Sequence, residues 1–275
     1  MKTMKSKFYS LALAAGMLSL TACSDDNTND SNNDKGNGIE NGSILKGTIT
    51  EDVTLKAGNT YKLSGEYIVE AGATLNIEEG VKIISVYDNI VDYILVKQGA
   101  KINAVGTPDK PIVMTSEKEE PGAWGGIHIC GKAHTNAEGG KGSSEIGGAV
   151  YGGNDDADNS GTLQYIRLEY TGFAFDEEHE ANGISFYGVG NGTIVDHCEA
   201  YKGSDDGFEF FGGSVNVSNM VVVSCSDDSF DWTEGWNGKG TDLVAYQEAK
   251  ATLGYDCDCL IEADNNENDN AATPV

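Results

Sequence analysis

Basic side chains are scarce in this sequence. Lysine and arginine number 18 against 44 aspartates and glutamates, the formal net charge is −26, and Arg167 is the only arginine. A surface of that sign repels phosphate groups. The charge therefore argues against nucleic acid and anionic membrane surfaces as partners, and it favours cations such as calcium or neutral molecules.

Long amphipathic helices and a disulfide framework are also missing. No long window shows apolar residues at a sustained 3.6-residue spacing, so we expect few helices. An odd number of cysteines follows Cys23, without the spacing of a metal site, which argues against a set of structural disulfides. These are Cys130, Cys198, Cys225, Cys257 and Cys259.

Residues 1–22 have the anatomy of an export signal. Lys2, Lys5 and Lys7 precede an apolar run that is too short to span a membrane, and L-T-A-C follows at 20–23. The segment resembles a bacterial lipoprotein signal, which implies that Cys23 is lipidated and becomes the mature N-terminus. The alternative is an ordinary secretory signal with a chance cysteine.

Residues 23–42 are predicted to be a disordered tether. They are nearly all Asp, Asn, Ser and Gly, which cannot bury enough apolar surface to fold. The acidic S-D-D-N directly after Cys23 resembles the surface-export signal of Bacteroidota lipoproteins. That resemblance implies an outer-membrane lipid anchor with the folded domain facing the cell exterior.

Short β-rich runs broken by glycine make up residues 43–275. The phrase S-D-D-G-F-E-F at 204–210 returns as S-D-D-S-F-D-W at 226–232, and A-G-A-T-L at 71 returns as Q-G-A-K-I at 98. Repeats of roughly 20 to 30 residues built from short strands are typical of a solenoid, in which each rung covers the apolar face of the last.

Stacking the repeats predicts which side chains lie inside the coil. Because side chains alternate along a strand, Ser185, Glu209 and Asp231 should point outward while their neighbours point inward. A longer spacing between two rungs places an insertion near residues 173–181. The predicted inward columns are Ile184–Phe208–Phe230, Phe186–Phe210–Trp232, Ile166–Cys198–Met220 and Leu168–Ala200–Val222.

The stacking pattern resembles the right-handed parallel β-helices of the pectin-lyase-like type. More narrowly, G-A-W-G-G-I-H-I, G-T-L-Q-Y-I-R-L-E-Y-T-G and S-D-D-G-F-E-F-F-G-G are similar to motifs of β-helix surface lipoproteins of Bacteroidota, a group with no established activity. The expected fold is therefore all-β, with about 22 or more residues per rung. Because the sequence ends in E-A-D-N-N-E-N-D-N-A-A-T-P-V without a capping element, we expect a coil that is truncated at its C-terminal end.

One enzymatic interpretation starts from the repeated aspartates. D-G-F-E followed by D-D resembles polygalacturonases and would make Asp206, Asp227 and Asp228 the catalytic carboxylates of a polysaccharide hydrolase. The G-H-G and R-I-K segments of that family have no counterpart one rung later. Hydrolysis therefore stays an alternative.

A lyase interpretation rests on V-D-H-C at 195–198, which faintly resembles a segment of pectate lyases. Uronate elimination needs basic groups, and this chain has few. His197 is more simply a turn residue stacked between Tyr165 and Asn219. Arg167 is expected to point outward and pair with Glu199 on the next rung.

Calcium is the cofactor that the acidic repeat favours. Asp205, Asp206, Asp227 and Asp228 recur at one corner of successive rungs, where like charges repel unless they are protonated or bridged by a hard cation. The alternative is that these aspartates bond the backbone N–H groups of their own turns.

A second calcium feature is the stretch N-D-D-A-D-N-S-G at 154–161. Asp156 and Asp158 match the first positions of an EF-hand-type loop, but Arg167 stands where that loop needs a glutamate. The stretch belongs to a long Gly- and Asp-rich loop at 132–160, which is predicted to leave the coil after Cys130.

Exposed aromatic residues complete the candidate site. Tyr187, Phe211 and Trp236 are expected to lie outside the coil beside Glu209 and Asp231, where rings suit the flat faces of sugars. The sequence thus predicts a surface lipoprotein that binds a glycan or another surface component without catalysis, with calcium as a possible aid. The alternatives are a polysaccharide hydrolase or lyase, and a purely structural or adhesion module.

Overall fold

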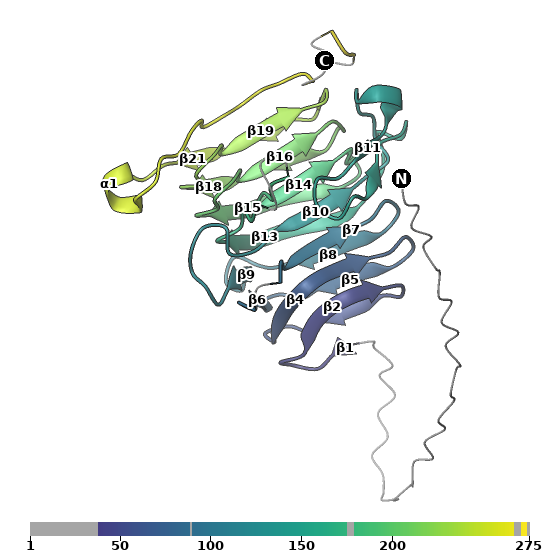
Figure 1. The fold of residues 1–275 in the computed structure, drawn as a ribbon. Helices are drawn as coiled ribbons and strands as arrows, with labels where there is room; N and C mark the ends of the chain where they lie inside the picture. Colours follow the sequence, from purple (N-terminus) through teal and green to yellow (C-terminus); the bar gives the residue numbers. More distant parts are fainter. Residues whose placement is uncertain (1–37, 89, 175–178, 267–270, 274–275) are drawn as a thin grey trace, which may run out of the picture. The chain divides into compact units, whose positions relative to one another are not determined.

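The computed structural model describes residues 38–88, 90–174, 179–266 and 271–273. Nineteen parallel strands pair one rung above another (Figure 1). This confirms the predicted all-β, right-handed parallel β-helix. The described residues contain one α-helix, α1 (Lys250–Leu253), and one 3-10 turn at Glu138–Gly140. Neither is long enough or apolar enough to cross a membrane.

Each rung contributes strands to three faces of the coil. The first face contains β1 (Gly38–Ile39), β3 (Val53–Leu55), β5 (Thr74–Ile77), β8 (Lys101–Val105), the first parts of β13 (Gly161–Glu169) and β15 (Ile194–Tyr201), β17 (Asn216–Ser218) and β20 (Gly240–Thr241). The second contains the first parts of β2 (Ile44–Ile49) and β4 (Thr60–Val69), β6 (Lys82–Ser85), β9 (Ile112–Ser116), the second parts of β13 and β15, β18 (Val221–Val223) and β21 (Val244–Tyr246). The third contains the second parts of β2 and β4, β7 (Tyr93–Val96), β10 (Ile127–Cys130), β14 (Ile184–Tyr187), β16 (Phe208–Phe211) and β19 (Phe230–Thr233).

The predicted stacking register is confirmed. Phe208 lies between Ile184 and Phe230 in the core, and Glu209 lies between Ser185 and Asp231 on the outward side. On strands β13, β15 and β18 the predicted neighbours also align: Ile166 with Cys198, and Leu168 with Ala200 and Val222. The inward side chains are buried in one continuous apolar core.

Tyr165, His197 and Asn219 share a turn position between the first and second faces, as predicted. All three adopt the left-handed backbone conformation, with φ of 50°, 52° and 52°. That conformation costs roughly 1–2 kcal/mol for a non-glycine residue. Stacking of the Tyr165 and His197 rings, whose centroids are 4.4 Å apart, offsets part of that cost.

The long loop after Cys130 leaves the coil as predicted and packs over the third face. It carries the antiparallel pair β11 (Gly142–Ser143) and β12 (Val150–Tyr151). Tyr151 and its neighbours in the loop cover Tyr187 and Phe211, which are only 0% and 9% exposed. Our expectation of exposed rings at these two positions is therefore wrong: both point out of the coil, but the loop buries them.

Trp236 differs from expectation as well. Its ring packs partly buried against the core and stacks on Phe210 at a centroid distance of 4.5 Å. Its Nε1–H donates a hydrogen bond to the backbone oxygen of Val215 at 3.1 Å. Trp236 is therefore part of the core packing, because the corner after β19 turns the ring back onto the apolar stack.

The described coil begins earlier than expected and continues after β21. Strand β1 starts at Gly38, so residues 38–42 belong to the coil, whereas the predicted signal, Cys23 and the rest of the tether lie outside the described residues. Residues 258–264 run along β19, where the N–H of Glu262 donates to the oxygen of Phe230 at 3.0 Å. The described cysteines after Cys23 are all free thiols.

Candidate functional site: an acidic pocket on the third face

The repeated acidic phrase lies at the corner where the second face turns into the third. Asp205 and Asp206 precede β16, and Asp227 and Asp228 precede β19 one rung above. The corners are joined by a hydrogen bond from the N–H of Gly207 to the oxygen of Asp228 at 2.9 Å. The repeat therefore places two aspartate pairs one above the other.

These aspartates open into a cavity of about 570 Å³, which we call the acidic pocket. Its volume lies in the usual range of ligand sites. Among the described residues that line it, none is a lysine or an arginine. The lining residues are Glu145, His179, Glu180, Asp205, Asp206, Glu209, Asp227, Asp228, Asp231 and Glu262.

One carboxylate oxygen of Asp206 and one of Asp228 accept a hydrogen bond from the backbone of the next rung. Asp206 Oδ1 accepts a hydrogen bond from the N–H of Asp228 at 2.9 Å, and Asp228 Oδ1 accepts one from the N–H of Cys259 at 2.7 Å. These oxygens thus bond backbone N–H groups, as one of the two interpretations of the repeat expected, but the donors belong to the next rung and not to the aspartates' own turns. Each carboxylate keeps a second oxygen.

The carboxylates of the acidic pocket form overlapping clusters with the spacing of cation ligands. In each cluster one oxygen from every member lies within 4.8 Å of the others. Distances of that size are compatible with ligands around one hard cation, which takes 6 to 8 oxygens at about 2.3–2.6 Å. The clusters are Glu180–Asp205–Asp227, Asp206–Asp227–Asp228, Asp206–Glu209–Asp231 and Asp228–Asp231–Glu262.

Burial, a hydrogen bond and electrostatic repulsion raise the pKa of two carboxyl groups in the acidic pocket, Asp205 and Glu262. Burial, followed by the charges of Glu180 and Asp227, raises the pKa of Asp205 to about 8. The hydrogen bond with Asp228, followed by burial, raises the pKa of Glu262 to about 7. Near neutral pH these groups therefore hold protons that a bound cation would displace.

The pKa values of three further carboxyl groups, Asp206, Glu209 and Asp231, are also raised. Burial is the main cause that raises the pKa of Asp206 and of Glu209 well above the usual ranges, and it raises the pKa of Asp231 to about 6. Glu209 Oε2 accepts a hydrogen bond from Asn182 Nδ2 at 2.6 Å. Asp231 Oδ1 is buried and has no hydrogen-bond partner, so it is an acceptor that needs a proton or a cation.

The structure brings the three predicted catalytic aspartates together at one corner. One oxygen each of Asp206, Asp227 and Asp228 lies within 4.8 Å of the others. Their role in hydrolysis stays a prediction. The turn hydrogen bonds of Asp206 and Asp228 also give these side chains a role in the fold.

Asp156 and Asp158 lie outside these clusters. Asp156 Oδ1 accepts hydrogen bonds from the backbone N–H of His134 and from its ring Nδ1, and Asp158 Oδ2 accepts one from the N–H of Lys132 at 3.1 Å. Both carboxylates fasten the start of the long loop. Among the described residues, neither side chain belongs to a group of three or more potential metal ligands, and their role in calcium binding stays a prediction.

His197 and Arg167 occupy the positions predicted from stacking. His197 Nδ1 lies 2.9 Å from Asp196 Oδ2 at the first corner and is not part of the acidic pocket. Arg167 Nη1 pairs with Glu199 Oε1 at 3.0 Å, and its Nε donates to Glu169 Oε1 at 2.6 Å. Neither residue lines the acidic pocket.

Sequence reasoning missed Glu145, His179, Glu180 and Glu262. Glu262 had a detectable signal, because I-E-A at 261–263 repeats F-E-F and F-D-W, and Ile261 pairs with Phe230. The other three come from insertions, for which no repeat exists.

A comparison with family models matches residues 47–275 to a family described as a pectate-lyase like beta helix domain. The matched span runs from the second part of β2 through the acidic pocket. Comparisons with curated proteins and with solved structures gave no match.

Proposed function

The chain belongs to the pectate-lyase-like β-helix family, and we propose that it is a non-catalytic binding module. In this proposal it holds calcium in the acidic pocket and uses it to bind a glycan or another surface component. The proposal rests on the overlapping carboxylate clusters of that pocket. The buried Asp231 Oδ1, which has no donor, supports it independently. A hard divalent cation satisfies both features at once.

Calcium would do two things in this pocket. It would replace the protons that the raised pKa values of Asp205 and Glu262 imply near neutral pH. It would also present an electropositive centre on an otherwise acidic surface, to which hydroxyl or carboxylate oxygens of a ligand can coordinate. Without such an ion the pocket repels anions.

The location of the module is a further part of the proposal. We infer from the N-terminal sequence that Cys23 is lipidated and that the coil is carried on the outer membrane, facing outward. The acidic, lysine-poor composition suits a domain that does not lie against anionic lipid.

Calcium titration by calorimetry at pH 8 tests the proposed function. We expect a dissociation constant of roughly micromolar order for the purified chain. The variant Asp227→Asn/Asp231→Asn should weaken binding at least about tenfold, because it removes two charges without removing turn acceptors. The matched control is Glu78→Gln/Glu79→Gln, which alters two carboxylates that pair with lysines far from the pocket.

Two results would contradict the proposal. Equal affinity in the wild type and in Asp227→Asn/Asp231→Asn would place the ion elsewhere. Absence of heat in a folded chain would leave the aspartates as turn residues and favour a structural module.

A further inference from the structure

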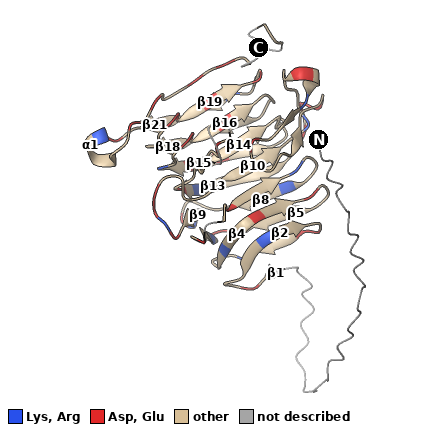
Figure 2. Cartoon of the chain, in the orientation of Figure 1, with Lys and Arg blue, Asp and Glu red and all other residues tan. Residues whose placement is uncertain are grey.

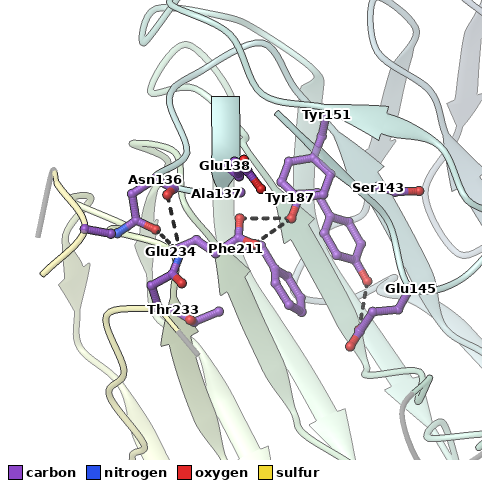
Figure 3. Close-up of a pocket in the computed structure, with 12 residues that line it drawn as sticks. Asn136, Ala137, Glu138, Ser143, Glu145, Tyr151, Tyr187, Phe211, Thr233 and Glu234 are labelled. Atoms are coloured by element: carbon purple, nitrogen blue, oxygen red, sulfur yellow. Dashed lines mark hydrogen bonds between the residues drawn. The ribbon is translucent and has the colours of Figure 1, made fainter. Parts of the chain in front are cut away.

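A cavity of about 540 Å³ between the long loop and the third face is largely satisfied by the protein's own contacts (Figure 3). Tyr151 donates to Glu234, whose oxygens both lie 2.9 Å from the hydroxyl, and Tyr187 donates to Glu145 Oε2 at 3.1 Å. Thr135 Oγ1 also donates to Glu234, at 2.6 Å. Because both tyrosine rings are buried as well, this cavity leaves a ligand little to bind.

A different cavity, of about 450 Å³, opens on the first face at the last rungs. We call it the amide pocket. None of the described residues that line it is an aspartate or a glutamate, whereas carboxylates make up nearly all of the acidic pocket. The lining residues are Asn191, Ser214, Asn216, Val217, Ser218, Asn237, Lys239 and Thr241.

The wall of the amide pocket is built from outward side chains of two stacked rungs. Ser218 on β17 pairs with Thr241 on β20. Val217, between Asn216 and Ser218, is only 2% exposed and belongs to the core, so its two neighbours point outward. The N–H of Val217 donates to the oxygen of Lys239 at 2.8 Å, which brings Lys239 next to Asn216.

Most of the polar side chains in the amide pocket are available to a ligand. Ser214 Oγ donates to the oxygen of Asp156 at 2.7 Å, and Ser218 Oγ donates to Asp196 Oδ1 at 2.8 Å. The other five polar side chains are exposed, and none of them forms a hydrogen bond or an ion pair with another described residue. They are Asn191, Asn216, Asn237, Lys239 and Thr241.

Tight packing of the backbone holds two of these amides in place. Asn191 stands between two glycines, and a Cβ added to either of them would lie 2.6 Å or 2.5 Å from a backbone oxygen of the long loop. A Cβ on Gly238, which follows Asn237, would overlap the backbone oxygen of Val215. Groups on a packed backbone lose less freedom when a ligand binds, so the site is partly preorganised.

The charges around the amide pocket favour a neutral ligand. Lys239 is the one charged residue among the described lining residues. Aspartates lie just behind the wall, since the N–H of Asn191 donates to the oxygen of Asp156 at 2.8 Å. Ser218 likewise bonds Asp196. These carboxylates oppose a bound anion and Lys239 opposes a bound cation, so the complementary ligand is neutral and both donates and accepts hydrogen bonds.

We propose that the amide pocket binds a neutral hexose residue. Hydroxyl groups of the sugar donate to amide oxygens and accept hydrogen bonds from amide, hydroxyl and ammonium groups of the wall. Ile194, which pairs with Asn216 one rung below and is 51% exposed, offers apolar surface to the C–H groups of the ring. This site lies on another face than the acidic pocket and needs no calcium, so the inference goes beyond the proposed function.

Titration of methyl glycosides into the isotope-labelled full chain, with a calcium chelator present, tests this inference by nuclear magnetic resonance. The probes are the neutral methyl glycosides of glucose, galactose and mannose. We expect at least one of them to shift the side-chain amide signals of Asn191, Asn216 and Asn237 together, with a dissociation constant on the order of millimolar.

Two variants locate the sugar. Asn216→Asp should weaken binding at least about fivefold, because a carboxylate keeps the acceptors of the amide but lacks its two N–H donors. The matched control is Asn103→Asp, which adds the same charge to the first face on β8, outside the amide pocket. It should leave the affinity unchanged.

Three results would overturn the inference. The first is that none of the three glycosides shifts these signals even at about 50 mM. The second is that Asn216→Asp and Asn103→Asp change the affinity equally. The third is that a methyl uronate, or a short neutral peptide with blocked ends, shifts the same signals as strongly as the sugars. Calcium binding that is lost in Asp227→Asn/Asp231→Asn would still support the proposed function, so the two failures are distinguishable.

Discussion

The first and last rungs of the coil follow the same register but differ in how their charged side chains stack. Opposite charges stack on the first rungs, and like charges stack on the last. On the first rungs lysine lies against glutamate from one rung to another: Lys56 Nζ is 3.3 Å from Glu78, and Lys97 Nζ is 2.6 Å from Glu70. Residues of both signs are visible side by side on these strands (Figure 2). Each such exposed pair contributes only about 0–1 kcal/mol, but it leaves no field of one sign.

On the last rungs acid is stacked on acid. Asp227 lies above Asp205, and Asp231 lies above Glu209 in the strand register, with no lysine or arginine among the described lining residues. A parallel coil repeats each choice of side chain about every 4.8 Å. Stacked charges of one sign therefore cost stability unless protons or a cation compensate them.

The cores of the two regions also differ, and this difference carries the largest expected effect. Val96, Ile129, Phe186 and Phe210 form one inward column, from aliphatic to aromatic. We expect Phe210→Ala to lower the free energy of unfolding by about 3–5 kcal/mol, because the ring stacks on both Phe186 and Trp236. Urea unfolding followed by circular dichroism measures it.

The matched change on the first rungs is Val96→Ala. It removes two methyl-sized groups instead of a phenyl ring and should cost about 1–2 kcal/mol. Equal losses for Phe210→Ala and Val96→Ala would contradict the prediction, because the larger aromatic side chain would then contribute no more to stability than the valine.

The acidic pocket should make stability depend on pH in an unusual direction. The unfolded chain releases its carboxyl protons above about pH 4. In the folded state three carboxyl groups of the acidic pocket keep their protons to higher pH, because the pKa of Asp231 is about 6, that of Glu262 about 7 and that of Asp205 about 8. The unfolded state binds fewer protons in that window, so stability falls as pH rises from about 4 to 8. We expect Tm, measured with a calcium chelator present, to drop by on the order of 5 °C.

Two variants locate the origin of this pH dependence. Glu209→Gln should flatten the fall in Tm, because the amide has no proton to lose and still accepts the hydrogen bond from Asn182. Glu78→Gln should leave the curve unchanged. A Tm that rises between pH 4 and 8, or one that both variants alter equally, would refute the assignment to the acidic pocket.

The smallest effect is expected at Arg167, which forms ion pairs with Glu169 and Glu199. It bonds Glu169 and Glu199 and its guanidinium lies 4.6 Å from the ring centroid of Tyr201, but its side chain is 35% exposed. Solvent screens such contacts, so Arg167→Ala should cost less than about 1 kcal/mol and leave calcium affinity unchanged. A larger loss in urea unfolding would mean that Arg167 organises the second face.

Stacking arguments predicted the coil well and the candidate site only in part. The positions of Phe208, Glu209 and His197 followed from sequence, because alternation along a strand and the repeat between rungs are both local rules. The same rules led to a wrong expectation for Tyr187 and Phe211, since they give the direction of a side chain but not what covers it.

The sequence by itself determined the rung register, the inward columns and the corner where the aspartates stack, since each rung repeats the pattern of the previous one. Only the tertiary structure decided that the loop after Cys130 folds back over the third face, buries Tyr187 and brings Glu145 to the wall of the acidic pocket. The physical reason is that this loop has no repeat to follow. Its place depends on long-range contacts, such as the hydrogen bond between Tyr151 and Glu234, that no local pattern encodes.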